Sequence, residues 1–556
     1  MGRALRGVAT LVWALWAAAQ LAPALGDDRA SGARPGAWRA RSAAPGYNVV
    51  LVVLDDLRSF ETDPLAVAPT MKALAARGVS FRNAQAEKSD CAPSRLAMLS
   101  GRRVDALRVW DFAPEFRKFN PRLLTLPGLA RKAGYTTRSV GKVLDPRNFA
   151  AAERGDQCPG AGGKACSWDL VVNVAKEAPS RCGVRTLYPY PSARTARAGE
   201  LGVHTFADAD EPYATDACVA KIAVAHLGEL AAAGGPFFLA VGLVATHLPW
   251  IAPQSVAALF RNATLPDARV WSSIAQAATA LPFFLNESSS LSWTNSNELT
   301  QYKRWPPNKA DWVRAYYASL AWMDQQVGRI VDAVDALSAP VRDKTLLLLW
   351  SDNGMHMGEH ETWLKKTVFD RANTVPLIVL PPSQFRAANP GWRAGRVISA
   401  PVQSTDIMPT LLDMLNIPDV LGGDGLPQSR AGTSLVPLML GQLAFVRQAA
   451  ISQYWGHNTK TKRTIMGYSI RTVRHRFIAY FPFESSTKGN GLQYDPARAL
   501  AAYLELYDYS KDGAYEKVNR VNDTGYAVIK QRFLDMIAQR TDRDWTNGIG
   551  IAPFDL

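Results

Sequence analysis

The chain has 556 residues, of which 47% are hydrophobic and 20% are charged. This composition is ordinary for a folded globular protein, and the length exceeds that of a typical single domain. The body of the chain has no apolar run long enough to span a membrane, which excludes an internal membrane span. The formal net charge of +14 favours a polyanionic partner. No nucleic-acid-binding motif accompanies this charge, so nucleic acid is not expected as a partner.

The N-terminus has the charged and then apolar order of a secretory signal. Arg3 and Arg6 precede an apolar stretch over 8–25, and small residues up to Gly26 form a cleavage site. We expect residues 1–26 to be removed and residues 27–46 to form a flexible leader. An uncleaved anchor is the alternative. After cleavage no stable membrane span is expected, and the protein would be extracellular or would reach a lysosome or vacuole-like compartment.

Three Asn-x-Ser/Thr sequons fit a glycosylated protein of the secretory pathway. They begin at Asn262, Asn286 and Asn522.

The five cysteines leave one thiol unpaired in an oxidising compartment. The other four can form two disulfides, and the sequence does not fix their pairing. Proximity along the chain favours Cys158 with Cys166 and Cys182 with Cys218. Cys91 is then the unpaired residue.

Strand-like apolar runs alternate with helical segments from residue 48 to residue 415. The run 48–54 is apolar throughout, which is typical of a strand buried on both faces. The helical segments 69–77 and 126–133 each end at a glycine, and Thr125 caps the second. This alternation predicts an α/β fold with a large, mostly parallel sheet flanked by helices. The expected strands are 48–54, 136–140, 236–241, 345–350 and 376–380, and the expected helices are 69–77, 94–99, 126–133, 215–233, 309–337 and 404–415.

The pattern changes after residue 442. An alternating, hairpin-length stretch covers 468–483, a short strand covers 504–509, and a last helix covers 527–539. We therefore expect a catalytic domain over 47–442 and a smaller C-terminal subdomain over 443–556 that contains an antiparallel sheet.

Two predicted strands run directly into side chains with oxygen atoms. Asp55 and Asp56 follow strand 48–54, and Asp352 and Asn353 come two residues after strand 345–350. In an open α/β sheet, ligands bind outside the carboxyl ends of the strands. Carboxylates gathered there repel one another unless a cation lies between them, and all-oxygen ligands select Ca²⁺ or Mg²⁺. Each pair alone would suit a helix cap or a turn, but the two together predict a metal site.

The most specific motif is Cys-Ala-Pro-Ser-Arg at 91–95, followed by Ser-Gly-Arg at 100–102. It resembles the signature of the sulfatase family. The resemblance implies that Cys91 is oxidised to formylglycine, an aldehyde, by the formylglycine-generating enzyme in the secretory pathway. It also accounts for the odd number of cysteines. The alternative is a buried structural cysteine.

The same resemblance implies an alkaline-phosphatase-like sulfatase fold, one bound Ca²⁺ and a covalent mechanism. One hydroxyl of the hydrated aldehyde would attack sulfur, and the second would later release sulfate. Arg95 would orient the hydrate, and Lys142 and Lys365 would hold sulfate oxygens. His247 would protonate or orient the leaving group. The implied metal ligands are Asp55, Asp56, Cys91, Asp352 and Asn353, and the implied catalytic residues are Cys91, Arg95, Lys142, His247 and Lys365.

One position departs from the family pattern. Sulfatases usually have a histidine three residues after the lysine of the Gly-Lys segment, where this chain has Asp145. The histidine helps to hold the hydrated aldehyde. An aspartate there would pair with Lys142 or Arg95, or accept a proton, and would add negative charge beside an anionic substrate.

Segments 139–143, 236–242 and 465–472 look like the iduronate-2-sulfatase branch of the family. Together with the positive net charge, this similarity implies hydrolysis of sulfate esters on a sulfated polysaccharide or a glycosaminoglycan-type saccharide. Two alternatives stay open. One is a phosphonate or phosphate ester hydrolase of the same superfamily, and the other is a pseudoenzyme that binds sulfated glycans without cleaving them.

Overall fold

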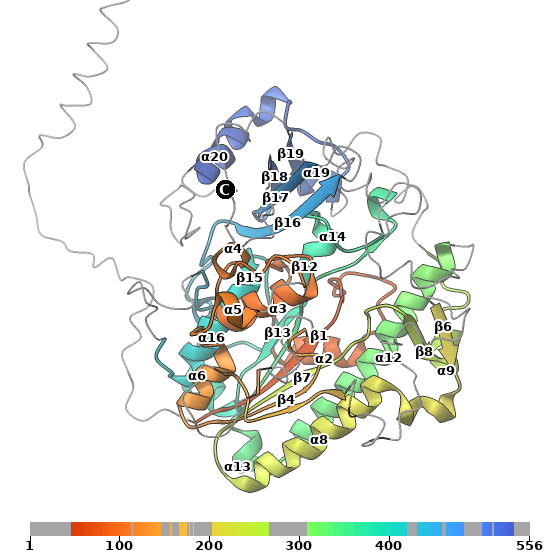
Figure 1. Ribbon diagram of the computed structural model, residues 1–556, viewed down its shortest axis with the longest axis vertical. Coiled ribbons are helices and arrows are strands. Elements are labelled where there is room, and N and C mark those ends of the chain that lie inside the picture. Colours follow the sequence, from red (N-terminus) through yellow and green to blue (C-terminus); the bar gives the residue numbers. More distant parts are fainter. Residues whose placement is uncertain are drawn as a thin grey trace, which may run out of the picture. The chain divides into compact units, whose positions relative to one another are not determined.

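An eight-stranded sheet forms the centre of the computed structural model (Figure 1). In spatial order it contains β14 (Arg396–Ile398), β2 (Val79–Phe81), β13 (Leu377–Leu380), β9 (Thr345–Ser351), β1 (Asn48–Leu54), β7 (Phe237–Gly242), β4 (Thr136–Gly141) and β5 (Leu170–Val172). β1 pairs in parallel with β7 and β9, whereas β13 runs antiparallel to β9 and β2. The predicted large, mostly parallel sheet is confirmed.

The structure describes residues 46–112, 116–145, 156–157, 166–174, 177, 182, 203–265, 309–361, 363–419, 431–458, 463–482, 503–513 and 516–538. Ala43–Leu556 makes one compact unit. The predicted signal 1–26 and nearly all of the leader 27–46 lie outside the described residues. The domain boundary at residue 442 stays a prediction.

Strand β1 shows why the sheet needs cover on both faces. Its side chains alternate between two cores, with Val50 and Val52 in one and Val49, Leu51 and Val53 in the other. All five are fully buried, as a central strand between two helical layers requires. Helices α2 (Pro69–Arg77), α8 (Thr215–Ala233) and α12 (Lys309–Asp335) contribute to the first core, and α3 (Cys91–Ser100), α6 (Leu126–Lys132) and α16 (Ile407–Leu415) contribute to the second.

Most predicted helices agree with the structure to within two residues, and two differ by more. The helix predicted over 94–99 begins three residues earlier, at Cys91, because Pro93 is tolerated in the first turn. The helix predicted over 404–415 begins as a 3₁₀ turn, η7 (Ser404–Asp406), and continues as α16. Thr125 caps α6 as predicted, since its side chain accepts a hydrogen bond from the Gly128 N–H.

A second, four-stranded sheet confirms the antiparallel C-terminal part. It contains β16 (Ala450–Asn458), β17 (Arg463–Arg471), β18 (His475–Pro482) and β19 (Tyr503–Asp508) in that order. Every neighbouring pair is antiparallel. Helix α20 (Ala527–Ala538) packs against it through Phe533, whose ring stacks on Phe477. The sequence did not reveal β16.

A disulfide joins Cys182 to Cys218 on α8, with the two Cα atoms 5.9 Å apart. Cys166 is also disulfide-bonded, and its predicted partner Cys158 lies outside the described residues. Cys91 is a free, buried thiol. A membrane-spanning helix would have to be long and apolar, and none of the helices described here meets both conditions.

Candidate active site

The ends of β1 and β9 bring the predicted metal ligands together. Leu54 and Ser351 are paired in the parallel register, so Asp55 and Asp352 both leave the sheet at the same edge. The Asp56 N–H donates a hydrogen bond of 3.0 Å to the Asp352 carboxylate. Both segments are fully buried here, although charged residues are rarely buried without partners.

Helix α3 places Cys91 against this pair of strand ends. Its Sγ lies 3.2 Å from Asp55 Oδ1 and 2.9 Å from Lys365 Nζ. Lys142 Nζ lies 3.7 Å from the same sulfur. Burial, followed by the charges of Asp352 and Asp55, raises the pKa of the Cys91 thiol well above its ordinary value. An unmodified Cys91 is therefore a neutral thiol at neutral pH.

Arg95 lies one helical turn after Cys91, so both side chains point to the same side of α3. Its Nε donates to Asp352 Oδ2 at 2.7 Å, and its Nη2 lies 3.0 Å from Asp55 Oδ1. Its Nη1 bonds the carbonyl oxygen of Lys142. Burial alone would lower the pKa of Arg95, but the two aspartates raise it above its ordinary value. The guanidinium thus joins the ends of β1, β4 and β9.

Two lysines complete the charge pattern, each bonded to a different aspartate. Lys142 follows β4, and its ammonium bonds the Asp55 carboxylate. Lys365 follows β11 (Trp363–Leu364), and its ammonium bonds Asp56. Leu364 and Lys366, on either side of Lys365, both have left-handed backbone angles, with φ of 66° and 62°. Non-glycine residues hold such angles only where their surroundings impose them, and this is common at functional sites.

The donor set fits a hard divalent cation. Oxygen atoms of Asp55, Asp56 and Asp352 and the sulfur of Cys91 all lie within 4.8 Å of one another. The Asn353 side chain donates to Asp56 at 2.8 Å, and its buried Oδ1 has no hydrogen-bond partner among the described residues. Burial raises the pKa of Asp352 to about 6 even though Arg95 opposes the shift. A cation with oxygen ligands would stabilise these crowded carboxylates and could also bind the unused amide oxygen.

His247 reaches the cluster from the loop after β7. Its Nε2 lies 4.0 Å from Asp56 Oδ2, and its Nδ1 lies 2.8 Å from the Leu248 carbonyl oxygen. The loop is held by Asp216 at the start of α8, whose carboxylate accepts hydrogen bonds of 2.8 and 2.7 Å from the N–H groups of Val244 and Ala245. Asp216 was not predicted from the sequence, where it reads as an ordinary acidic residue in a helix's first turn.

Asp145 borders the same cluster. It is buried, and its Oδ2 lies 3.7 Å from Lys142 Nζ. Of the two ion pairs suggested by the sequence, the structure therefore shows the one with Lys142.

The structure brings all the predicted catalytic and metal residues into one buried cluster. Asn262 and Asn522 are exposed, and Asn286 lies outside the described residues. The roles of these residues stay predictions.

A buried network behind Lys365 was not visible in the sequence. Arg476 on β18 is fully buried, donates to the Val368 carbonyl at 3.0 Å and pairs with Asp370 and Glu516 at 2.9 and 2.7 Å. The available signal was Arg476 itself, a charged residue that follows His475 at the start of a largely apolar strand.

Comparisons with known proteins match most of this chain. The family model described as Sulfatase matches residues 47–417, and the model described as N-sulphoglucosamine sulphohydrolase, C-terminal, matches residues 358–508. The iduronate 2-sulfatase of Mus musculus is 28% identical over 527 residues, which cover 85% of this chain and 89% of that protein. Arylsulfatase K of Homo sapiens is 25% identical over 489 residues, covering 84% and 80%.

Solved structures share the fold. A phosphonate monoester hydrolase of Agrobacterium radiobacter superposes with a TM-score of 0.64 and 21% identity, covering 88% of this chain and 95% of that one. A 2-O GAG sulfatase superposes with a TM-score of 0.59 and 19% identity, covering 88% and 91%. The predicted alkaline-phosphatase-like sulfatase architecture is confirmed.

Proposed function

Because this chain belongs to the sulfatase family and is a sulfate ester hydrolase, we propose that it acts on sulfated saccharides with a formylglycine at residue 91 and one bound Ca²⁺. The observation that carries the proposal is the position of Cys91. It is the one free cysteine in the described part of the chain, and it is buried where three carboxylates meet three cationic side chains.

A sulfate ester needs positive charge at its oxygens and a nucleophile in line with the leaving alcohol. Once oxidised, residue 91 supplies that nucleophile as a hydrated aldehyde. The ammonium groups of Lys142 and Lys365 lie 3.7 and 2.9 Å from the present sulfur atom. They are therefore placed to neutralise the oxygens of a sulfuryl group that approaches residue 91.

Arg95 positions residue 91 indirectly, because both residues belong to α3 and both contact Asp55. Its bonds to Asp352 and Asp55 fix both strand ends relative to the first turn of α3. Residue 91 therefore has a defined direction toward an incoming substrate, which is the main contribution that positioning makes to such a reaction.

His247 is the proposed proton donor to the leaving alcohol. It lies at the edge of the cluster, with its Nε2 4.0 Å from Asp56 Oδ2. Its Nδ1 contact with a backbone oxygen orients the ring, which leaves Nε2 facing the cluster.

Asp55, Asp56, Asp352 and Asn353 would hold the cation. Ca²⁺ accepts such a mixed carboxylate and amide set more readily than Mg²⁺ does, because Mg²⁺ retains several waters. Bound there, it would withdraw charge from oxygens at residue 91 and from the sulfuryl group.

Three observations support the substrate class and the compartment. The relatives include proteins named iduronate 2-sulfatase, and the formal net charge of +14 suits a polyanionic saccharide. A disulfide and two exposed sequons fit passage through the secretory pathway, where the formylglycine-generating enzyme would act. We propose an extracellular or lysosomal location on this basis.

The test is made on protein from a secretory host. Trypsin cleavage after Lys88 and Arg95 releases peptide 89–95, and its mass should show the aldehyde in place of the thiol at residue 91. Cys91→Ala should fold with an unchanged melting temperature and lose sulfate release from an aryl sulfate by more than roughly a thousandfold.

Two results would contradict the proposal. An unmodified thiol in active protein would remove the mechanism, and sulfate release by Cys91→Ala at the wild-type rate would remove residue 91 from it. Faster turnover of an aryl phosphonate than of the matched aryl sulfate would favour the phosphonate alternative.

A further inference from the structure

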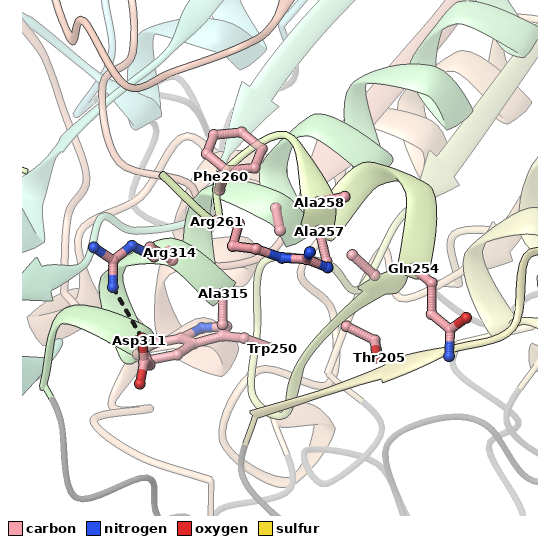
Figure 2. A pocket seen from close by; sticks show the side chains of 12 residues that line it. Thr205, Trp250, Gln254, Ala257, Ala258, Phe260, Arg261, Asp311, Arg314 and Ala315 are labelled. Atoms are coloured by element: carbon pink, nitrogen blue, oxygen red, sulfur yellow. Dashed lines mark hydrogen bonds and ion pairs between the residues drawn. The ribbon is translucent and has the colours of Figure 1, made fainter. Parts of the chain in front are cut away.

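A cavity of about 460 Å³ lies outside the predicted active site (Figure 2). It is bordered by β6 (Val203–Phe206), β8 (Trp250–Pro253), α9 (Gln254–Ala258) and the first turns of α12. No predicted catalytic or metal-binding residue lines it. Its volume falls within the range of small-ligand pockets.

The lining combines an apolar wall with a polar rim. The buried Trp250 and Phe260 line the cavity together with Ala257 and Ala315, and the exposed Gln254 and Thr205 add polar groups. An apolar wall with a few hydrogen-bonding groups suits a sugar ring, which has apolar faces and hydroxyl groups around its edge.

Two guanidinium groups give the cavity its charge. Figure 2 shows the Arg261 side chain extending across the middle of the cavity, with Arg314 at one end joined to Asp311. The Arg314–Asp311 contact is 2.9 Å, and the buried Arg314 Nε has no hydrogen-bond partner among the described residues. The Arg261 guanidinium likewise has no partner within the described ranges. The cavity therefore has unused donors and a positive charge.

The same structural elements separate this cavity from the cation cluster. The Trp250 indole donates to the Thr246 carbonyl at 2.9 Å, next to His247. Trp312, beside Asp311, packs edge-on against Trp363 with ring centroids 4.9 Å apart, two residues before Lys365. Trp250 in the cavity wall thus contacts the segment that carries His247, and Trp312, the neighbour of Asp311 in the chain, contacts the segment that carries Lys365.

We propose that this cavity is an accessory subsite that binds an anionic saccharide unit of the substrate, at a distance from the sulfate that is cleaved. This inference rests on the proposed action on sulfated saccharides. Arginine is suited to the task because its planar fork can donate two parallel hydrogen bonds to a sulfate or carboxylate group. A short aryl sulfate would use the active site alone, whereas a longer sulfated saccharide would use both.

The experiment compares two substrates in four variants of the full chain. The substrates are an aryl sulfate and a sulfated tetrasaccharide from lyase-digested heparin. The variants are Arg261→Gln, Arg314→Gln, their combination and the control Arg329→Gln. Arg329 is an exposed residue of α12 that does not line the cavity, and its guanidinium lies 3.0 Å from the Glu211 carboxylate. In the double variant, KM for the tetrasaccharide should rise roughly fivefold to tenfold with kcat unchanged. KM for the aryl sulfate should not change, and the control should match wild type on both.

Binding to the inactive Cys91→Ala protein keeps this test separate from the proposed activity. The tetrasaccharide should bind Cys91→Ala more weakly when both arginines are replaced, and a desulfated tetrasaccharide should bind equally weakly to both proteins. Equal affinity for the sulfated ligand with and without the arginines would overturn the subsite. So would a rise in KM that is the same for both substrates, because that result would indicate damage to the shared wall. If the wild-type protein did not turn over the aryl sulfate at all, that result would count against the proposed function and not against the subsite.

Discussion

Asp145 adds a fourth carboxylate to a cluster that must receive an anion. Its Oδ2 lies 3.7 Å from Lys142 Nζ, and the same ammonium also bonds Asp55. Lys142 therefore shares its charge between two carboxylates before any substrate arrives. Since low-dielectric surroundings strengthen such pairs, they weaken the attraction for sulfate that the proposed role of Lys142 requires.

Asp145→Asn should therefore improve binding of an anionic substrate. We expect KM for an aryl sulfate to fall by roughly threefold to tenfold, because removing one negative charge near Lys142 is worth about 1 kcal/mol. Asp145→His should act in the same direction and should also change the preference among sulfate esters. Initial rates at constant ionic strength measure both effects.

The control is Asp343→Asn, which removes an exposed carboxylate that lies 3.5 Å from Arg342. It should leave KM unchanged, since surface pairs contribute little. An unaltered KM in Asp145→Asn would make this position a bystander.

At the scale of single residues, the sequence reveals groups that share a recognisable edge or motif. Asp55 and Asp352 could be paired in advance because both follow buried strands, and parallel strands end at the same edge. Asp216 could not, because its partners are two backbone N–H groups about 28 residues away, and nothing in the sequence identifies which loop it bonds. Local patterns do not encode long-range hydrogen bonds of this kind.

At the scale of elements, the C-terminal sheet supports the segment that carries Lys365. Arg476 on β18 donates to the Val368 carbonyl and pairs with Asp370, and Glu516 pairs with Arg476 and accepts the Asp370 N–H. All of these groups are buried. Because Leu364 and Lys366 have left-handed backbone angles, the segment needs such external bonds to stay in place.

Arg476→Lys should misplace Lys365 rather than simply unfold the protein. A lysine keeps the charge but cannot reach Val368, Asp370 and Glu516 together, since it lacks the planar fork. We expect kcat for an aryl sulfate to fall by roughly tenfold to a hundredfold, as a displacement of about 1 Å can cause. Arg474→Lys is the matched control, because Arg474 is half-exposed and pairs with Asp508 near the same turn.

A double-mutant cycle separates positioning from general damage. In a Lys365→Met background, Arg476→Lys should cost little further activity if it acts through that lysine. An equal loss in both backgrounds would show that Arg476 stabilises the fold without positioning Lys365.

Elements whose boundaries depend on local sequence signals were predicted well, whereas a strand that depends on distant partners was missed. β1 and α8 were predicted to the residue, since a continuous apolar run and a glycine stop are local signals. β16 was missed because it includes Gln453, which is buried by the β17 pairing and by the Glu87 carbonyl, to which its N–H donates. Polar residues satisfied by distant backbone do not show a strand pattern.

At the scale of the whole molecule, the predicted cation joins segments that are far apart in sequence. Asp56 and Asp352 are 296 positions apart and follow the neighbouring central strands β1 and β9. Cys91 is the first residue of α3, which contributes to the second of the two cores of the sheet. Arg95 and the two lysines balance the carboxylates in part, but Asp352 still has a raised pKa of about 6, chiefly because of burial. A divalent cation bound beside these carboxylates would favour their charged forms.

Removing the cation should lower the stability of the whole chain. A ligand that binds only the folded state at a hundred times its Kd stabilises it by about 2.7 kcal/mol. Chelation of purified protein should therefore lower the melting temperature by roughly a few degrees, and Ca²⁺ should restore it more completely than Mg²⁺. Asp352→Ala should melt at the same temperature with and without chelator, because a ligand and its charge are both gone. Asp335→Asn, which removes only an exposed pair with Arg77, should keep the full response to chelation. If chelation left the wild-type melting temperature unchanged while metal analysis showed that the ion had been removed, the carboxylates would be stabilised by Arg95, Lys142 and Lys365 alone, and the cluster would need no metal to hold the two central strands in register.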